Sequence, residues 1–379
     1  MKYFRSKLVL LAAFAVLSQT SCTWLDSALS SVTGIVGLSD TATVIAKTAQ
    51  IRTSYAVVAA DLLEVKRGEK LDVLDKVEFE KVLWYRVRAH DATDTEGWIE
   101  AQHVITSETL EKSLKVAEEF KDLAPQAAGQ IRAKSNLRLA PDMSPDNVLF
   151  MLAAGSNFEI MDWKFVPKEE LPDVDDASRG EQSRTARTRN AEVEAARVKG
   201  EAEKLDEKYD IWYQVKLDPS VSPAPAGWIF GRQVELSVPS EIVFFQQNNR
   251  KFVTWQRLDS EVASVSTGRA ATPGNWVILT RTNVVKAIDG VEPDFDGILV
   301  LAFDKYDQSY YTVWRSSGEV WGTLPLKLEG SGDTKTFTLA LRHPEGRMDE
   351  KRFVVFRDKS RIKLTPPEDI AQYQSARTR

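Results

Sequence analysis

The sequence predicts a mainly β protein, with two small barrels followed by a C-terminal antiparallel meander or barrel. Two observations carry this prediction. One β unit is duplicated within the first 237 residues, with its landmark residues at matched spacing. After residue 240 the chain alternates apolar and polar residues in many short runs, and turn residues separate neighbouring runs.

The duplicated unit is marked by two short motifs. Trp-Tyr-x-Val begins at Trp84 and again at Trp212, and Gly-Trp-Ile follows at Gly97 and at Gly227. Each copy closes with a valine seven residues after that glycine. We interpret these glycines, and the glycine upstream in each copy, as turn or bulge residues. The matched spacing indicates that one small β unit was duplicated.

The N-terminus has the layout of an export signal. Three basic residues precede an apolar run from residue 8 to residue 17. This run is too short to span a bilayer as a settled helix, which needs about 20 apolar residues. Residues 1–22 are therefore predicted to be a signal peptide of the lipoprotein type, and residues 23–44 a tether rich in Ser, Thr, Ala and Gly.

Cys22 is the only cysteine and comes directly after the apolar run. A lone cysteine at this place resembles a bacterial lipoprotein, in which the cysteine is acylated and becomes the new N-terminus. The resemblance implies lipid attachment at Cys22, although Gln19 stands where that family has leucine. Because Thr23 rather than aspartate follows, it also implies an outer-membrane location facing the periplasm. Ordinary cleavage near Ser21 beside an incidental cysteine is the alternative.

The first β unit covers residues 45–106, and Val57-Val58 is one of its expected strands. Residues 107–128 are predicted to form an amphipathic linker helix packed against a neighbouring β unit. Its apolar residues recur at helical spacing: Leu110, Leu114, Ala117, Phe120 and Leu123.

The second β unit covers residues 129–237 and contains a charged insertion, residues 164–208. Residues 181–208 are rich in good helix formers but lack an apolar stripe, so we expect a helix that projects into solvent. Two interpretations of the insertion stay open: a silent, solvated segment, or an arm that docks a partner.

Residues 240–366 are predicted to be an all-β domain of short antiparallel strands, in a meander that closes or nearly closes like a lipocalin. Its expected strands include Ile242–Gln246 and Val284–Ile288. Residues 367–379 are expected to be a disordered tail. Five aromatic residues of this domain either line a small-ligand cavity or fill its core: Tyr306, Tyr310, Tyr311, Trp314 and Trp321.

The duplicated unit resembles the bacterial SH3-like domain, SH3b. The resemblance rests on the Trp-Tyr strand, the Gly-Trp-Ile strand and the opening segment Leu137-Arg138-Leu139-Ala140-Pro141, and it covers roughly a third of the chain. The first copy departs from the family at Ile51-Arg52-Thr53, before its first loop. Members occur mostly in envelope proteins, and many bind cell-wall peptides or glycans. The resemblance therefore implies a non-catalytic protein that binds a cell-wall peptide or glycan, or an envelope protein.

Flat aromatic rings offer apolar faces to extended peptides and to sugar rings. The candidate ligand contacts are therefore the aromatic residues of the two repeated motifs: Trp84, Tyr85, Trp98, Trp212, Tyr213 and Trp228. Because neighbouring residues alternate faces along a strand, one ring of each Trp-Tyr pair is expected in the core and the other outside. Each ring has packing as its alternative role. A structural scaffold in an envelope complex, and small-ligand binding by the C-terminal domain, are the alternative functions.

Composition and motifs favour neither catalysis nor nucleic-acid binding. The chain has 50 basic and 55 acidic residues, and this acidic balance argues against nucleic-acid partners. None of its three histidines has metal-ligand spacing from another, and no nucleophile or phosphate-loop motif is present. We expect no enzyme activity, no cofactor and no metal. Glu292, Asp294 and Asp296 form an acidic group that is either a weak cation site or a solvated turn.

Overall fold

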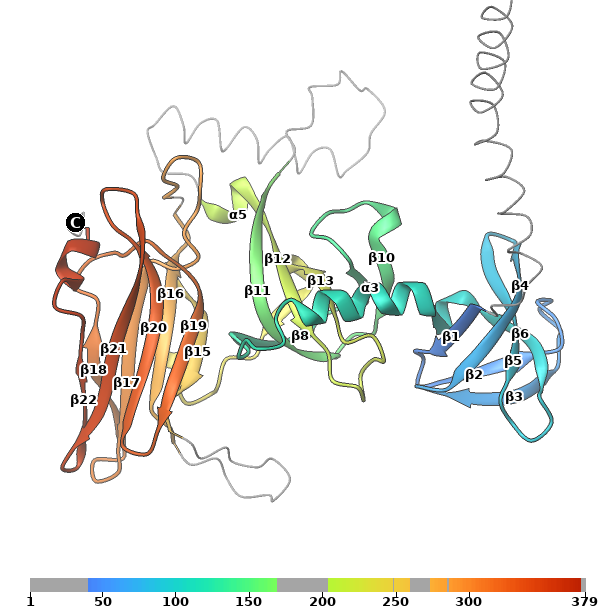
Figure 1. Ribbon diagram of the computed structural model, residues 1–379, viewed down its shortest axis with the longest axis horizontal. Helices are drawn as coiled ribbons and strands as arrows, with labels where there is room; N and C mark the ends of the chain where they lie inside the picture. The colour runs from blue at the N-terminus through green and yellow to red at the C-terminus, as the bar shows by residue number, and fades with distance from the viewer. Residues whose placement is uncertain (1–39, 169–203, 248, 260–272, 285, 376–379) are drawn as a thin grey trace, which may run out of the picture. The chain divides into compact units, whose positions relative to one another are not determined.

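The computed structural model describes residues 40–168, 204–247, 249–259, 273–284 and 286–375. These residues are mainly β and form four antiparallel sheets (Figure 1). The chain divides into two compact units, Met1–Ser107 and Glu108–Arg379. The signal peptide, Cys22, residues 23–39 of the expected tether and residues 169–203 of the expected insertion lie outside the described residues.

The first unit is a seven-stranded sheet in the order β3-β2-β6-β5-β4-β1-β7. Its strands are β1 (Asp40–Val44), β2 (Thr48–Arg52), β3 (Asp61–Lys66), β4 (Lys70–Phe79), β5 (Val82–Ala89), β6 (Glu96–Glu100) and β7 (Val104–Thr106), with a 3-10 turn η1 (Ala101–His103) before β7. A two-residue turn joins β4 to β5, and both of its residues, Glu80 and Lys81, have positive φ. This conformation matches the twist of the strands it joins.

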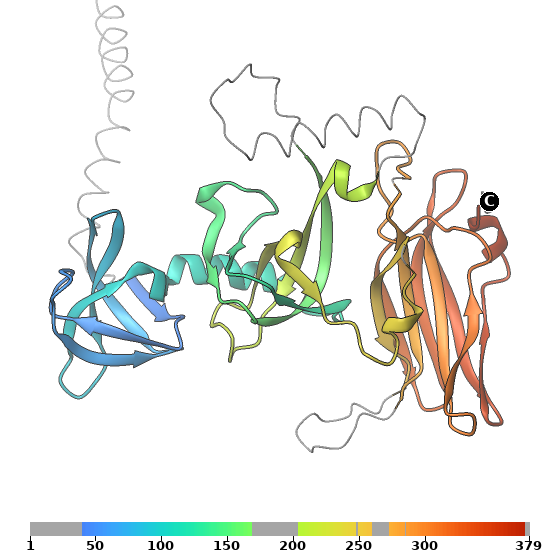
Figure 2. The ribbon, with the colours of Figure 1, turned by 180° about the vertical axis from the view of Figure 1, so that it is seen from behind.

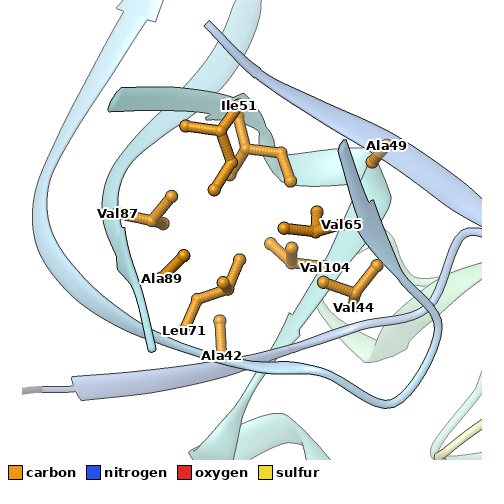
Figure 3. Packing of buried hydrophobic residues seen from close by; sticks show 10 residues of the cluster. Ala42, Val44, Ala49, Ile51, Val65, Leu71, Val87, Ala89 and Val104 are labelled. Atoms are coloured by element: carbon orange, nitrogen blue, oxygen red, sulfur yellow. The ribbon is translucent and has the colours of Figure 1, made fainter. Parts of the chain in front are cut away.

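The core of this unit comes from alternate residues of its strands. Ile51, Leu71 and Val87 point toward one another inside the sheet (Figure 3). Tyr85 is partly buried and packs against the same cluster. Alternation places Trp84 on the opposite face of β5 from Tyr85. The core therefore depends on the period-two pattern that the sequence shows.

The second unit begins with a sheet of the same strand order, β10-β9-β13-β12-β11-β8-β14. Its strands are β8 (Ala127–Ile131), β9 (Ser135–Arg138), β10 (Val148–Leu152), β11 (Asn157–Pro167), β12 (Tyr209–Lys216), β13 (Ala226–Phe230) and β14 (Val234–Leu236), with 3-10 turns η2 (Pro145–Asn147) and η3 (Gly231–Gln233). Each strand occupies the place of its counterpart seven strands earlier. The repeated sequence motifs therefore correspond to a repeated topology.

Helix α3 (Ser107–Glu118) begins where the predicted linker begins and ends five residues before Leu123, the last apolar residue of the expected helical pattern. Its segment packs against the second sheet, where Phe120 contacts Met161 and Ala226. The Ser113 hydroxyl donates to the carbonyl of Ala226 at 2.6 Å and accepts from its N–H at 3.1 Å. These contacts fix the helix to β13 and to the middle of β11.

The C-terminal part consists of two four-stranded meanders, in which each strand pairs with the next one along the chain. One contains β15 (Arg250–Arg257), β16 (Trp276–Thr282), β17 (Gly297–Asp304) and β18 (Ser309–Arg315), and the other β19 (Gly322–Ser331), β20 (Thr334–Arg342), β21 (Met348–Asp358) and β22 (Arg361–Thr365). The sheets form two layers (Figure 2). Aromatic rings from both sheets contact one another. Phe353 stacks on Phe337 at 4.6 Å and contacts Trp314 at 5.5 Å.

Several sequence expectations were wrong at the level of single elements. Val57-Val58 is an exposed turn rather than a strand, because it lies in the loop between β2 and β3. The expected strand Ile242–Gln246 contains the 3-10 turn η4 (Val243–Phe245). Around Val284 and Ile288 the described residues form only isolated bridges. The expected tether ends early, because Asp40–Val44 is strand β1, paired with both β4 and β7.

Two chain segments are more ordered than expected. Strand β11 continues through Pro167, so the first residues assigned to the insertion extend a hairpin instead. Within the expected disordered tail, the 3-10 turn η6 (Ile370–Tyr373) buries Ile370 and Tyr373. The Lys351 ammonium lies 4.3 Å from the centre of the Tyr373 ring, which holds this turn against β21.

The repeated glycines serve two different purposes. Gly68 and Gly155 have φ of +87° and +78° and form turns, as expected. Gly97 and Gly227 lie inside strands β6 and β13 instead. A Cβ atom at Gly97 would stand 2.5 Å from the carbonyl oxygen of Arg52, so glycine is required there by close approach of the neighbouring strand.

Candidate functional site

The six predicted ligand contacts differ in how much ring surface they leave exposed. Trp84 and Trp212 are only 6% and 2% exposed, so neither ring offers a face to a ligand. Tyr85 and Tyr213 are partly buried and lie on the core side of their strands. Burial raises the pKa of Tyr213 to about 12. In both Trp-Tyr pairs the tryptophan on the non-core face is therefore buried as well, which the alternation argument did not anticipate.

Trp98 belongs to a cluster of three aromatic rings in the first unit. The Tyr55 ring lies 5.1 Å from the Trp98 ring, edge to face, and 5.1 Å from the Phe79 ring. Tyr55 comes from the loop between β2 and β3, Phe79 from the end of β4, and Trp98 from β6. We call these residues the first-unit aromatic cluster. All three keep part of their surface exposed, and Phe79 is among the exposed large apolar residues.

The loop that carries Tyr55 is held in place by Arg52. The Arg52 Nη2 group donates to the carbonyl oxygens of Val57 and Ala59, each at 2.9 Å. Arg52 stands directly opposite Trp98 in the β2–β6 register. The same side chain forms a 3.4 Å ion pair with Asp61. The arginine thus connects the Tyr55 loop to the strand that carries Trp98.

The second unit repeats the arginine but not the ring cluster. Arg138 stands opposite Trp228 and its Nη1 group donates to the carbonyl of Ser144 at 2.6 Å and to Asn147 Oδ1 at 3.0 Å. The braced loop, residues 139–147, contains no aromatic residue. Trp228 therefore lacks the loop aromatic residue that packs on Trp98.

The β11–β12 hairpin of the second unit contacts the C-terminal sheets. The Arg281 guanidinium on β16 lies 4.8 Å from the centre of the Phe165 ring on β11. The N–H of Leu205, in the short helix α5 (Leu205–Lys208), donates to the carbonyl of Asn283 at 2.8 Å. Gln126 and Gln256 both donate to the carbonyl of Leu326. This hairpin is used for packing within the second unit.

The acidic group at Glu292, Asp294 and Asp296 is not a solvated turn, because the packed C-terminal sheets bury most of it. Asp296 accepts from Arg250 Nη1 at 2.8 Å and from the hydroxyl of Thr282 at 2.6 Å. Glu292 pairs with buried Arg281 at 2.7 Å. These contacts use the carboxylates for internal pairing. Within the described ranges, no group of three His, Cys, Asp or Glu side chains is placed to hold a metal ion.

Asp294 is the one member of this group with a strongly raised pKa. Burial, with a smaller effect from the nearby Asp162 carboxylate, raises the pKa of Asp294 to about 7. The N–H of Leu324 donates to Asp294 Oδ2 at 2.8 Å, which opposes the shift. Burial also raises the pKa of Asp162, on β11. Two half-buried carboxyl groups therefore lie near each other where the hairpin contacts the C-terminal sheets.

The aromatic residues of the C-terminal domain do not line one common cavity. Trp314 packs on Phe353 inside the two layers, and Tyr310 contacts Phe303 at 5.2 Å. Tyr306 is exposed in the turn after β17. The space near Trp314 is thus filled by side chains rather than open to a ligand.

Sequence reasoning named Trp98 as a candidate contact but did not name Tyr55 or Phe79, whose rings belong to the same cluster. The sequence did contain a signal for these two residues. Tyr55 is an aromatic residue in the loop before β3, and Phe79 directly precedes the two-residue turn of the next hairpin.

None of the helices in the part of the chain that the structure describes is long and apolar enough to cross a membrane. No protein-family model matches the chain, and a search of curated proteins finds no match.

Proposed function

We propose that this chain is an exported, lipid-anchored and non-catalytic binding protein of the cell envelope. In this proposal the two seven-stranded sheets are SH3-like domains, and the first binds a cell-wall peptide or glycan. The observation that carries the proposal is the first-unit aromatic cluster, in which Tyr55, Phe79 and Trp98 form one partly exposed ring surface.

The cluster has the properties that an extended ligand requires. Its rings provide apolar faces for the side chains of a peptide or for the C–H faces of sugars. Arg52 fixes the Tyr55 loop through two carbonyl contacts, so little conformational entropy is lost on binding. Exposed Val57 and Val58 extend the apolar surface along the same loop.

The second SH3-like domain has a scaffolding role in this proposal. Its hairpin contacts β16 through Phe165 and its helix-side face contacts Phe120, so two of its surfaces are already covered. A scaffold in an envelope protein complex is therefore the second candidate function. The charged insertion of this domain is the segment that would contact such a partner protein.

Anchoring in the proposal rests on the sequence. A basic segment, a short apolar run and the lone Cys22 fit export followed by acylation, and Thr23 fits the outer membrane on its periplasmic side. Replacing Cys22 by alanine should abolish incorporation of radiolabelled palmitate and release the chain from the membrane fraction. Unchanged labelling of this variant would rule out acylation at Cys22.

The binding proposal is tested by co-sedimentation of the chain with purified cell-wall sacculi. Trp98→Ala should reduce retention by at least about thirtyfold, because a central aromatic contact contributes about 2 kcal/mol or more. Trp228→Ala is the matched control, since Trp228 occupies the equivalent place opposite an arginine. Circular dichroism checks that both variants fold.

Three outcomes separate the two candidate functions. Loss of retention in Trp98→Ala alone supports binding by the first domain. Equal loss in both variants contradicts the division of roles between the domains. A parent chain that does not sediment with sacculi contradicts wall binding and favours the scaffold, which affinity capture with and without residues 181–203 would then examine.

A further inference from the structure

A cavity of about 240 Å³ lies on the β15–β18 sheet of the second unit and shares no residue with the first-unit aromatic cluster. The residues that matter for its chemistry come from three strands, the 3-10 turn η4 and the segment after β18. They are Phe244, Phe245, Arg250, Thr280, Thr312 and Glu319. Its size is below the roughly 300–1,000 Å³ of pockets for drug-sized molecules. A single small ring would fill it.

Arg250 is held rigidly at this cavity. Its Nη1 group donates to Asp296 Oδ1 at 2.8 Å and to Thr280 Oγ1 at 3.4 Å. Its Nη2 group lies 3.6 Å from Glu319. A Cβ atom at Gly297 would stand 2.3 Å from Arg250 Nη1, so only glycine leaves room for the guanidinium above β17. The arginine is thus positioned by the strand beneath it as well as by its partners.

The charges around the cavity compensate one another. Arg250 is paired with Asp296 and Glu319, and Glu319 also accepts from Lys286. Arg315 adds a second guanidinium to the lining. A ligand with a full negative charge would meet the Glu319 carboxylate, and a cationic ligand would meet the arginines. A neutral ligand that both donates and accepts hydrogen bonds avoids either conflict.

An exposed aromatic ring completes the cavity. Phe244 lies at the edge of the cavity and is 88% exposed. The ring of the adjacent Phe245 packs on the Tyr310 ring, with 5.9 Å between the ring centres. The Phe244 ring therefore places apolar surface beside the polar lining of the cavity. The C–H face of a sugar ring can cover such a surface while its hydroxyl groups reach polar side chains.

We infer that this cavity binds a small neutral polyhydroxylated ligand, of the size of one sugar ring. Phe244 stacks on the C–H face of the ring. The Arg250 guanidinium donates to ring hydroxyl oxygens, and the Glu319 carboxylate accepts from hydroxyl groups. The hydroxyl groups of Thr280 and Thr312 add further donors and acceptors. This site is separate from the ring surface proposed to bind the cell wall, so each can exist without the other.

Saturation-transfer NMR on the full chain in mild detergent tests this inference, with glucose and N-acetylglucosamine as probes and acetate and methylammonium as charged comparisons. We expect transfer to at least one sugar and none to either ion. Phe244→Ala should weaken sugar binding about tenfold or more. Tyr306→Ala is the matched control, because Tyr306 is an equally exposed aromatic residue of the same sheet, 87% exposed, outside the cavity lining.

A second variant tests the position of the arginine. Arg250→Lys keeps the positive charge but loses the planar fork, so sugar binding should fall while a circular dichroism spectrum stays unchanged. Loss of sugar transfer in Trp98→Ala, with transfer retained in Phe244→Ala, would place the sugar on the first unit and overturn the inference. Absence of transfer to both sugars would overturn the inference, as would binding of a charged probe alone or an equal loss in Phe244→Ala and Tyr306→Ala.

Discussion

Arg281 and Glu292 form a 2.7 Å ion pair whose side chains are 5% and 2% exposed. The pair lies beside the Phe165 ring of the second sheet, at the contact between the β11–β12 hairpin and β16. Within the described residues, Arg281 Nε and Nη1 and Glu292 Oε1 have no hydrogen-bond partner. A buried pair that is incompletely satisfied stabilises a protein little in itself, but losing one partner leaves an uncompensated buried charge. Removing either partner of this pair is therefore expected to be costly.

Glu292→Gln should therefore destabilise the second unit by about 3–5 kcal/mol, because the buried Arg281 charge loses its counter-ion. Urea unfolding of the full chain, followed by tryptophan fluorescence, measures the change. Asp289→Asn is the control, since Asp289 pairs with Arg342 at 2.6 Å but is exposed. The loss of stability in Asp289→Asn should stay below about 1 kcal/mol. Similar losses in the two variants would show that Arg281 and Glu292 are not buried together.

Asp294 should make the second unit less stable as pH rises. Its folded-state pKa of about 7 lies above the ordinary value of 3.8, so the unfolded chain loses this proton first. The contribution of this carboxyl group to stability is complete below pH 3.8, declines between pH 3.8 and 7, and stays low above pH 7. We expect a change on the order of 2 kcal/mol, less than the full linkage value because the carboxyl group is only half-buried.

The measurement is the difference in unfolding free energy between the parent chain and Asp294→Asn from pH 4 to pH 8. Other carboxylates titrate as well, and Asp91, with a pKa lowered to about 2 by contacts with Thr95, acts in the opposite direction. The difference between the two chains removes these shared contributions. A difference that does not vary with pH would contradict a raised pKa at Asp294.

Gly97→Ala should destabilise the first unit more than Gly68→Ala. A methyl group at Gly97 would stand 2.5 Å from the Arg52 carbonyl and 2.6 Å from the Ile51 side chain, so strand β2 must move. Overpacking of this kind costs about 2–3 kcal/mol. Gly68 faces open space, and its positive φ alone costs about 1 kcal/mol on substitution. Thermal unfolding of the full chain measures both, and the reverse order would refute the close approach at Gly97.

The parts of the fold that follow from local pattern were predictable. Alternation in β5 and β12, each followed by a Gly-Trp-Ile segment, identified the duplicated sheet before its strand order was known. The linker helix was predictable from the spacing that includes Phe120. In each case the signal lies within a few residues along the chain, where the side-chain period reflects a single strand or helix.

The parts that depend on distant contacts were not predictable. The rings of Tyr55, Phe79 and Trp98 meet only because Arg52 folds one loop back over the sheet. From its own segment, Glu292 is indistinguishable from a residue of a solvated turn. Its burial follows from the contact with Arg281 on strand β16. Whether a polar residue is buried depends on the elements that pack over it. The sequence around that residue does not identify those elements.

Two residues of the α3 segment that share one apolar stripe in the sequence differ in burial, because the segment packs on the second sheet. Phe120 is 3% exposed against Met161 and Ala226, whereas Leu114 is 50% exposed. Phe120→Ala should cost about 3 kcal/mol through lost burial and an unfilled cavity. Leu114→Ala should stay within about 0.5 kcal/mol, because little surface is buried there.

Hydrogen exchange of the full chain distinguishes loss of docking from general unfolding. In Phe120→Ala we expect faster exchange at the Ala226 N–H, which donates to the Ser113 hydroxyl, while Val87 in the first unit keeps its protection. Leu114→Ala should leave both amides unchanged. If Leu114→Ala destabilised the chain as much as Phe120→Ala, the helix would have to pack through a different face, and the contact between Ser113 and Ala226 would be excluded.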